Sequence, residues 1–130
     1  MRAVFPQLLP FSDVALLCLR LIVALVFFDS GRRHASDPVG RGESIGLSPA
    51  VTRLLGWAQM AAALGLALGV FTQVAALGLI VIMLGAIQKK LFVWHTGFWG
   101  DGTYGWHYDL LFVVANLVIL TTGGGRLVVL

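Results

Sequence analysis

The sequence predicts an all-α integral membrane protein, folded as a compact antiparallel bundle of four transmembrane helices. Of the 130 residues, 58% are hydrophobic and only 12% are charged, about half of the roughly 25% charged residues usual in soluble domains. The mean hydropathy of +0.91 leaves too few polar side chains to cover a water-exposed surface. Four apolar segments, each about as long as a bilayer core requires, are separated by polar or glycine-containing stretches.

These segments are predicted as helices over residues 12–31, 51–71, 72–92 and 107–123 of one domain, residues 1–130. Ser12 or Asp13 is a suitable N-cap for the first helix, and Gly31 is a suitable stop. The second and third segments meet at Phe71 and Thr72 with almost no linker, which predicts a tight helical hairpin. The fourth segment is near the lower length limit for a span.

Small residues on the second and third helices predict close helix packing. In lipid, a small residue at every fourth position lets helix backbones approach each other. The second helix carries such a ladder at Ala61, Gly65 and Gly69. The facing surface on the third helix is predicted at Ala75, Gly78 and Gly85.

The basic residues are distributed as in a membrane protein. The net charge of +3 could suggest nucleic acid, but these residues lie between apolar segments rather than in a cluster, so nucleic-acid binding is excluded. The loop side holds six and the terminal side two (Arg32, Arg33, Arg41, Arg53, Lys89 and Lys90; Arg2 and Arg126). This asymmetry predicts cytoplasmic first and third loops and outer termini, in a bacterial inner membrane. The single cysteine, Cys18, is interpreted as a small buried apolar residue.

Polar side chains inside the predicted spans are the main candidates for a site, because such residues are costly in lipid. Arg20, Gln59 and Asn116 are predicted to share one depth, about 10–12 Å below the loop face at about 1.5 Å per residue. Asp109 lies two turns nearer the mouth, and Gln88 lies near it. The pattern predicts a one-sided polar pocket that narrows to Arg20 and opens under the first and third loops.

Two interpretations of this pocket remain open, and they are compatible. In the structural one, Arg20 pairs with Asp109, or bonds Gln59 and Asn116, and fixes the helix register. In the functional one, the pocket binds a small polar or anionic ligand or a quinone head group. An arginine suits either ligand, because its planar fork donates several hydrogen bonds at once.

The third loop, "WHTGFWGDGTYGWHYD", also has two interpretations. Its aromatic residues (Trp94, Trp99, Tyr104, Trp106 and Tyr108) are typical of a membrane-interface belt. Alternatively, His95, His107 and Tyr108 line the mouth. His107 and Asp109 could there pass protons. The spacing of the two histidines matches no metal motif, which makes haem ligation unfavoured and predicts no metal site. No catalytic fingerprint is found, so catalytic residues stay unassigned.

Four stretches resemble the DoxX family of small four-helix membrane proteins. They are "LRLIVALVFFDSGRR", "GWAQMAAALGLALGVFTQVAALGL", "YDLLFVVANLVIL" and "TTGGGR", in an order that covers about residues 14–126. The resemblance departs from the family at Gln59, where glutamate is common. Arg20 therefore lacks one acidic partner, which leaves Asp109 as the main candidate, and proton chemistry at position 59 is in doubt.

The resemblance implies a link with membrane redox chemistry, because the related DoxD protein is a subunit of a thiosulfate:quinone oxidoreductase. The favoured hypothesis is a non-catalytic accessory subunit that anchors other subunits among membrane lipids and shapes a quinone or small-ligand pocket. A stand-alone quinone-linked oxidoreductase and a small anion transporter or channel are the alternatives. No cofactor is evident from the residues, although quinone fits the implied chemistry.

Overall fold

The computed structural model describes residues 4–100 and 105–128, and these residues form helices and connecting loops without strands. In chain order the elements are the 3-10 helix η1 (Pro6–Phe11), α1 (Ser12–Ser36), α2 (Pro38–Ile45), α3 (Pro49–Leu68), α4 (Thr72–Gln88), the π-helix η2 (Lys89–Val93) and α5 (Trp106–Thr122). Three continuous helices are long and apolar enough to cross a membrane (Pro6–Ser36, Pro49–Leu68 and Thr72–Val93). α5 is apolar but has only 17 residues, the lower limit of the usual range.

α1 extends five residues beyond its predicted end at Gly31. Gly31 is buried inside the helix, and a Cβ atom there would lie 2.5 Å from the carbonyl oxygen of Gly56. This glycine therefore allows close packing against α3 and does not end the helix. Beyond it, the Asp29 carboxylate lies 3.1 Å from both Arg32 and Arg33, pairs at helical spacing that support another turn.

α3 also differs from the predicted range, because it starts two residues earlier and ends three residues earlier. Ser48 caps its N-terminus, accepting a hydrogen bond from the Val51 N–H at 3.3 Å, and Pro49 follows at the first turn. Gly69 ends the helix in the left-handed region at φ 77°, a common stop for helices. The hairpin turn continues through Phe71, which also adopts positive φ, at 48°.

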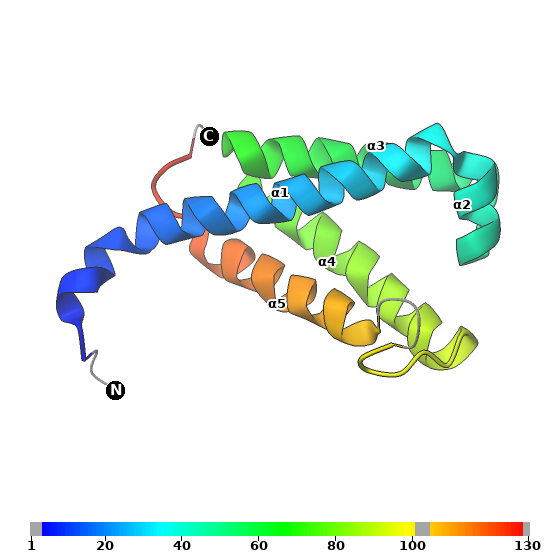
Figure 1. The fold of residues 1–130 in the computed structure, drawn as a ribbon. Helices are drawn as coiled ribbons and strands as arrows, with labels where there is room; N and C mark the ends of the chain where they lie inside the picture. The colour runs from blue at the N-terminus through cyan, green and yellow to red at the C-terminus, as the bar shows by residue number, and fades with distance from the viewer. Residues whose placement is uncertain (1–3, 101–104, 129–130) are drawn as a thin grey trace.

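The helices form two antiparallel pairs, α1 with α3 and α4 with α5 (Figure 1). The pairs meet near the α3–α4 turn and diverge from it, so α3 and α4 pack together over only part of their length. The described ends of the chain lie at the same end of the molecule as this turn. α2 and the loop before α5 lie at the other end.

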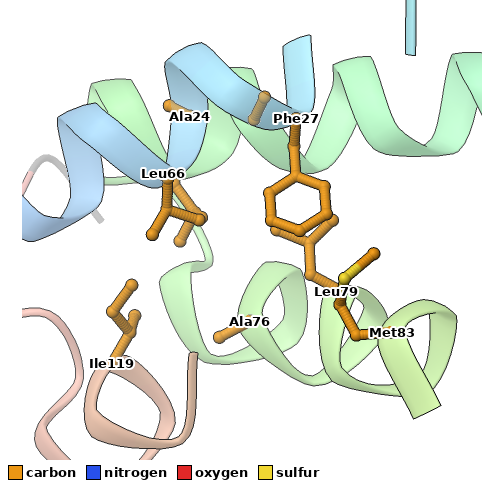
Figure 2. Close-up of a cluster of buried hydrophobic side chains, with 9 residues drawn as sticks. Ala24, Phe27, Leu66, Ala76, Leu79, Met83 and Ile119 are labelled. Carbon is orange, nitrogen blue, oxygen red and sulfur yellow. The ribbon is translucent and has the colours of Figure 1, made fainter. Parts of the chain in front are cut away.

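A small apolar core joins the two pairs (Figure 2). Its members are Val23, Ala24 and Phe27 of α1, Ala63 and Leu66 of α3, Ala76, Leu79 and Met83 of α4, and Ile119 of α5. The ring of Phe27 also contacts Phe112 of α5 edge-on, with 5.3 Å between centroids. Many large apolar side chains remain exposed on the outer helix faces, as expected of surfaces that face lipid. Cys18 is exposed as well, so the prediction that its side chain is buried is wrong. The structure is thus that of an integral membrane protein.

Candidate functional site

The predicted pocket residues occupy three separate places rather than one pocket. Arg20, Gln59, Asp109 and Asn116 are all buried, as costly polar groups inside a span should be. Gln88, in contrast, is exposed. The pocket residues divide into a terminal cluster around Arg20, two buried amides in mid-helix, and a loop cluster around Asp109.

The loop cluster is built on an ion pair that the sequence did not predict. Asp109 lies in the first turn of α5, and its carboxylate is 2.7 Å from the Nζ atom of Lys90 in η2. The two side chains are 4% and 13% exposed. Lys90 Nζ also donates to the Gly105 carbonyl oxygen at 3.4 Å and lies 5.7 Å from the ring centre of Tyr108. Asp109 therefore has a cation of its own, and the predicted Arg20–Asp109 pair is wrong.

Lys90 lies in η2, whose residues 89–93 take wider turns than an α-helix, an arrangement often found at functional sites. In the sequence, Lys90 was interpreted only as a signal of topology. The clue to the ion pair is that Lys90 and the acidic Asp109 flank the same loop.

Of the loop histidines, His107 is half-buried and His95 is exposed. His107 Nδ1 is 2.6 Å from the carbonyl oxygen of Phe98, and its ring packs against Phe98 and Trp99. His95 has a left-handed backbone at φ 52°. Within the part of the chain that the structure describes, no three His, Cys, Asp or Glu residues group closely enough to hold a metal ion.

Two of the four described residues of the predicted aromatic belt are on the surface of this loop. Trp94 and Trp99 are exposed, whereas Trp106 and Tyr108 are half-buried. Trp106 and Tyr108 contact Phe98 and Phe112 respectively, edge-on. Tyr104, the fifth predicted member of the belt, lies outside the described residues. The exposed rings have the position that a membrane-interface belt requires.

Two buried amides lie in the middle of α3 and α5. Asn116 donates from Nδ2 to the Phe112 carbonyl oxygen at 2.8 Å, within its own helix. Its Oδ1 atom, and the Oε1 atom of Gln59, have no hydrogen-bond partner among the described residues. Neither amide bonds Arg20, so the predicted three-residue network is also wrong.

The terminal cluster surrounds Arg20 with a segment from the other end of the chain. Arg20 is fully buried, and its Nη2 atom donates to the carbonyl oxygen of Leu127. The Thr72 hydroxyl donates to the Gly123 carbonyl oxygen at 2.6 Å. The Arg126 N–H donates to an Asp13 carboxylate oxygen at 2.9 Å. Residues 123–128, the C-terminal strap, are thereby folded over Arg20.

Arg20 and Gln59 do not share one depth, contrary to the prediction. The Cβ atom of Gln59 would lie 3.0 Å from a Cβ atom at Gly31, eleven residues after Arg20 and about 16 Å further along an α-helix. The prediction measured the depth of Arg20 from a helix end near Gly31. Since α1 continues to Ser36, Arg20 lies nearer the terminal end than the loop end.

A tight contact between α1 and α3 is formed by a glycine pair that the ladder prediction missed. Gly31 of α1 and Gly56 of α3 are so close that a Cβ atom on either would lie 2.5 Å from the carbonyl oxygen of the other. Neither glycine is part of the predicted ladder of small residues at every fourth position, and Gly31 was interpreted as a helix stop.

Four of the six predicted packing residues line an open groove between α3 and α4, and Gly69 and Gly85 do not. This lateral groove has a volume of about 520 Å³ and includes Ala61, Gly65 and Gly78 in its lining. Gly65 is tight, since its Cβ would lie 2.9 Å from the Val70 carbonyl oxygen. Cβ atoms at Gly78 and Gly85 would meet no described atom within 4 Å. Gly69 caps α3. The expected close packing along the whole ladder is therefore confined to the hairpin end.

Fold and polar residues together define a small helical membrane protein with buried charges at both ends of its helix pairs. The DoxX family profile matches residues 15–96. An uncharacterized membrane protein of Mycobacterium tuberculosis, Rv3486, is 33% identical over 127 residues, covering 86% of this chain and 77% of that protein. No solved structure matches the chain. The chain belongs to the DoxX family.

Proposed function

We propose that this DoxX-family protein is an accessory subunit of a membrane oxidoreductase complex, in which the lateral groove receives a transmembrane helix of another subunit. The open groove is the observation that carries the proposal. Helix association in lipid uses small residues that allow close backbone approach, and the groove presents Ala61 and Gly78 on facing helices. Both residues are exposed within this chain, so their small size is not required by internal packing.

The redox part of the proposal comes from the family. A DoxX-like chain is expected beside membrane oxidoreductases, with quinone as the co-substrate of the complex. The groove lining is almost wholly apolar, which also fits a quinone isoprenoid tail. In this arrangement α5 is the fourth spanning helix. The membrane is a bacterial inner membrane, and the first and third loops lie in the cytoplasm.

A photo-crosslinking amino acid at Gly78 tests the groove directly, with the same residue at Leu25 as the control. Leu25 is 67% exposed on α1, outside the groove lining. In native membranes, crosslinking from position 78 should capture one redox subunit in stoichiometric amount, and position 25 should not. A quinone-sized adduct at position 78 would contradict the placement of a subunit helix in the groove, and a chain that is captured alone would contradict the accessory role.

Replacing a small residue of the groove by a larger one is a second test of the proposed subunit contact. Gly78→Leu should fill the groove and reduce co-purification of the partner at least tenfold, while the variant itself stays folded. Ala15→Leu is the matched control, because Ala15 is an exposed small residue on α1, on the other helix pair. Equal co-purification by both variants would remove the groove from the proposal.

A further inference from the structure

Arg20 is a buried cation whose hydrogen-bonding capacity is mostly unused. Its side chain is fully buried, and the one acceptor that it meets among the described residues is the neutral carbonyl oxygen of Leu127. The Nε and Nη1 atoms have no hydrogen-bond partner among the described residues. Buried polar groups without partners are rare in native proteins, and each calls for an explanation such as a ligand or ion.

The charge of Arg20 is also uncompensated within the described chain. The three ion pairs found in residues 4–100 and 105–128 join Asp29 to its two arginines and Asp109 to Lys90. Asp13 is the acidic residue of the terminal cluster, but the contact found for it is a hydrogen bond from the Arg126 N–H. A guanidinium in a spanning helix without a counter-charge is unfavourable, so this position favours an anion.

We propose that Arg20 and the C-terminal strap form a binding site for a small oxyanion, which reaches Arg20 from the terminal end of the molecule by displacing the Leu127 carbonyl. An oxyanion supplies both a negative charge and several acceptor atoms for the unused N–H groups. Its hydrogen bonds to the guanidinium join two ionised groups and can be bidentate, whereas the carbonyl that it replaces is neutral and contributes one oxygen atom. This inference does not depend on the proposed partner subunit.

The strap has the properties that such an exchange requires. Gly123, Gly124 and Gly125 all have positive φ, at 76°, 87° and 89°, which glycine adopts at little cost. A Cβ atom at Gly124 would lie 2.9 Å from Arg20 Cδ, so the strap packs directly on the arginine side chain. Leu127 and Arg126 are exposed on its outer side. A short surface segment thus separates the guanidinium from the terminal end, and Arg126 adds a positive charge there.

The site is tested by the NMR signal of the Arg20 Nε–H group in the full-length protein, labelled with ¹⁵N-arginine in zwitterionic micelles. Arg20→Lys assigns the signal by removing it. Titration with inorganic sulfate, against sodium chloride at equal ionic strength, should shift the Arg20 signal saturably and leave exposed Arg53 unchanged. An unchanged Arg20 signal, or equal shifts at both arginines, would overturn the proposal.

A second arm separates a free oxyanion from a lipid phosphate. In nanodiscs of phosphatidylglycerol, a headgroup ligand would shift the Arg20 signal relative to phosphatidylcholine nanodiscs, and added sulfate would then have no further effect. A free-anion site would instead respond to sulfate equally in both lipids. Either pattern supports the oxyanion site, and no response in either lipid rejects it.

The role of the strap is tested by Gly124→Ala, with Gly85→Ala as the matched control. The added methyl group would overlap Arg20 Cδ and would occupy a backbone at φ 87°, so the strap should loosen, sulfate should meet less competition, and its half-saturating concentration should fall at least threefold. Gly85→Ala adds a methyl group in open space outside the groove lining and should leave that concentration unchanged. A rise at Gly124→Ala, or equal values in both variants, would contradict displacement of the strap.

Discussion

At the scale of single residues, the function of a glycine in this protein depends on what lies opposite it. Gly31 and Gly56 face each other's backbone, where no atom can move aside cheaply. Gly78 and Gly85 face open space. These two kinds of glycine look alike in the sequence, yet the first kind fixes the distance between α1 and α3 and the second leaves a groove.

Gly31→Ala should lower the free energy of unfolding by about 2–3 kcal/mol, a typical value for overpacking a tight contact. The new methyl group would overlap the Gly56 carbonyl oxygen, so the helices must separate. Gly78→Ala should be neutral or should raise stability by up to about 1 kcal/mol, through helix propensity. Unfolding in mixed micelles with increasing SDS measures both changes. Equal stabilities would show that the α1–α3 contact is not tight.

At the scale of elements, the Lys90–Asp109 pair joins the end of the α4–η2 helix to the start of α5. Its two side chains are buried, whereas the side chains of Asp29 and its two arginines are exposed by 44% or more. This difference in burial determines how much each ion pair contributes to the stability of the protein. An exposed pair contributes about 0–1 kcal/mol, while breaking a buried one leaves an uncompensated charge.

Asp109→Asn should therefore destabilise the protein by about 3–5 kcal/mol, and Arg33→Gln by less than about 1 kcal/mol. The double variant Lys90→Met with Asp109→Leu removes both charges and should recover most of the lost stability. SDS-titrated unfolding of the three variants checks this order. A double variant as unstable as Asp109→Asn would indicate that the pair has a role other than mutual neutralisation.

At the scale of the whole molecule, the two helix pairs diverge from the α3–α4 turn (Figure 1). One consequence is the lateral groove, which remains open because α3 and α4 pack together over only part of their length. Another concerns α5, which has 17 residues against 22 in the continuous Thr72–Val93 helix and which carries the chain back toward the turn. The four-span arrangement therefore depends on α5 crossing the membrane.

Single cysteines in a Cys18→Ser background test this arrangement. Gly46→Cys and Trp99→Cys should both react with a membrane-impermeant thiol reagent from the cytoplasmic side. Arg126→Cys should react only from the other side, because α5 separates positions 99 and 126. All three positions are exposed. If positions 99 and 126 react from the same side, α5 does not span.

Much of the element structure followed from local sequence. Long apolar segments predicted the long helices, because lipid leaves a backbone few ways to satisfy its polar groups. The family resemblance, and the importance of Arg20, Gln59, Asp109 and Asn116 as buried polar groups, also followed from their positions in apolar runs. The errors at Gly31 and Gly69 arose because a glycine can be a helix stop or a packing point, and only its neighbours decide which.

Hydropathy and the cost of polar groups in lipid act on each segment alone, so the residues that must be buried in helices can be identified from the sequence. Which of the polar groups meet depends on how the helices are arranged in three dimensions. Asp109 pairs with Lys90 because the loop between η2 and α5 returns the chain beside itself. Arg20 is covered by residues more than one hundred positions away, because three glycines allow the strap to fold back. No local sequence pattern predicts the contact between Arg20 and the strap, since this contact depends on how the helix pairs are placed in space.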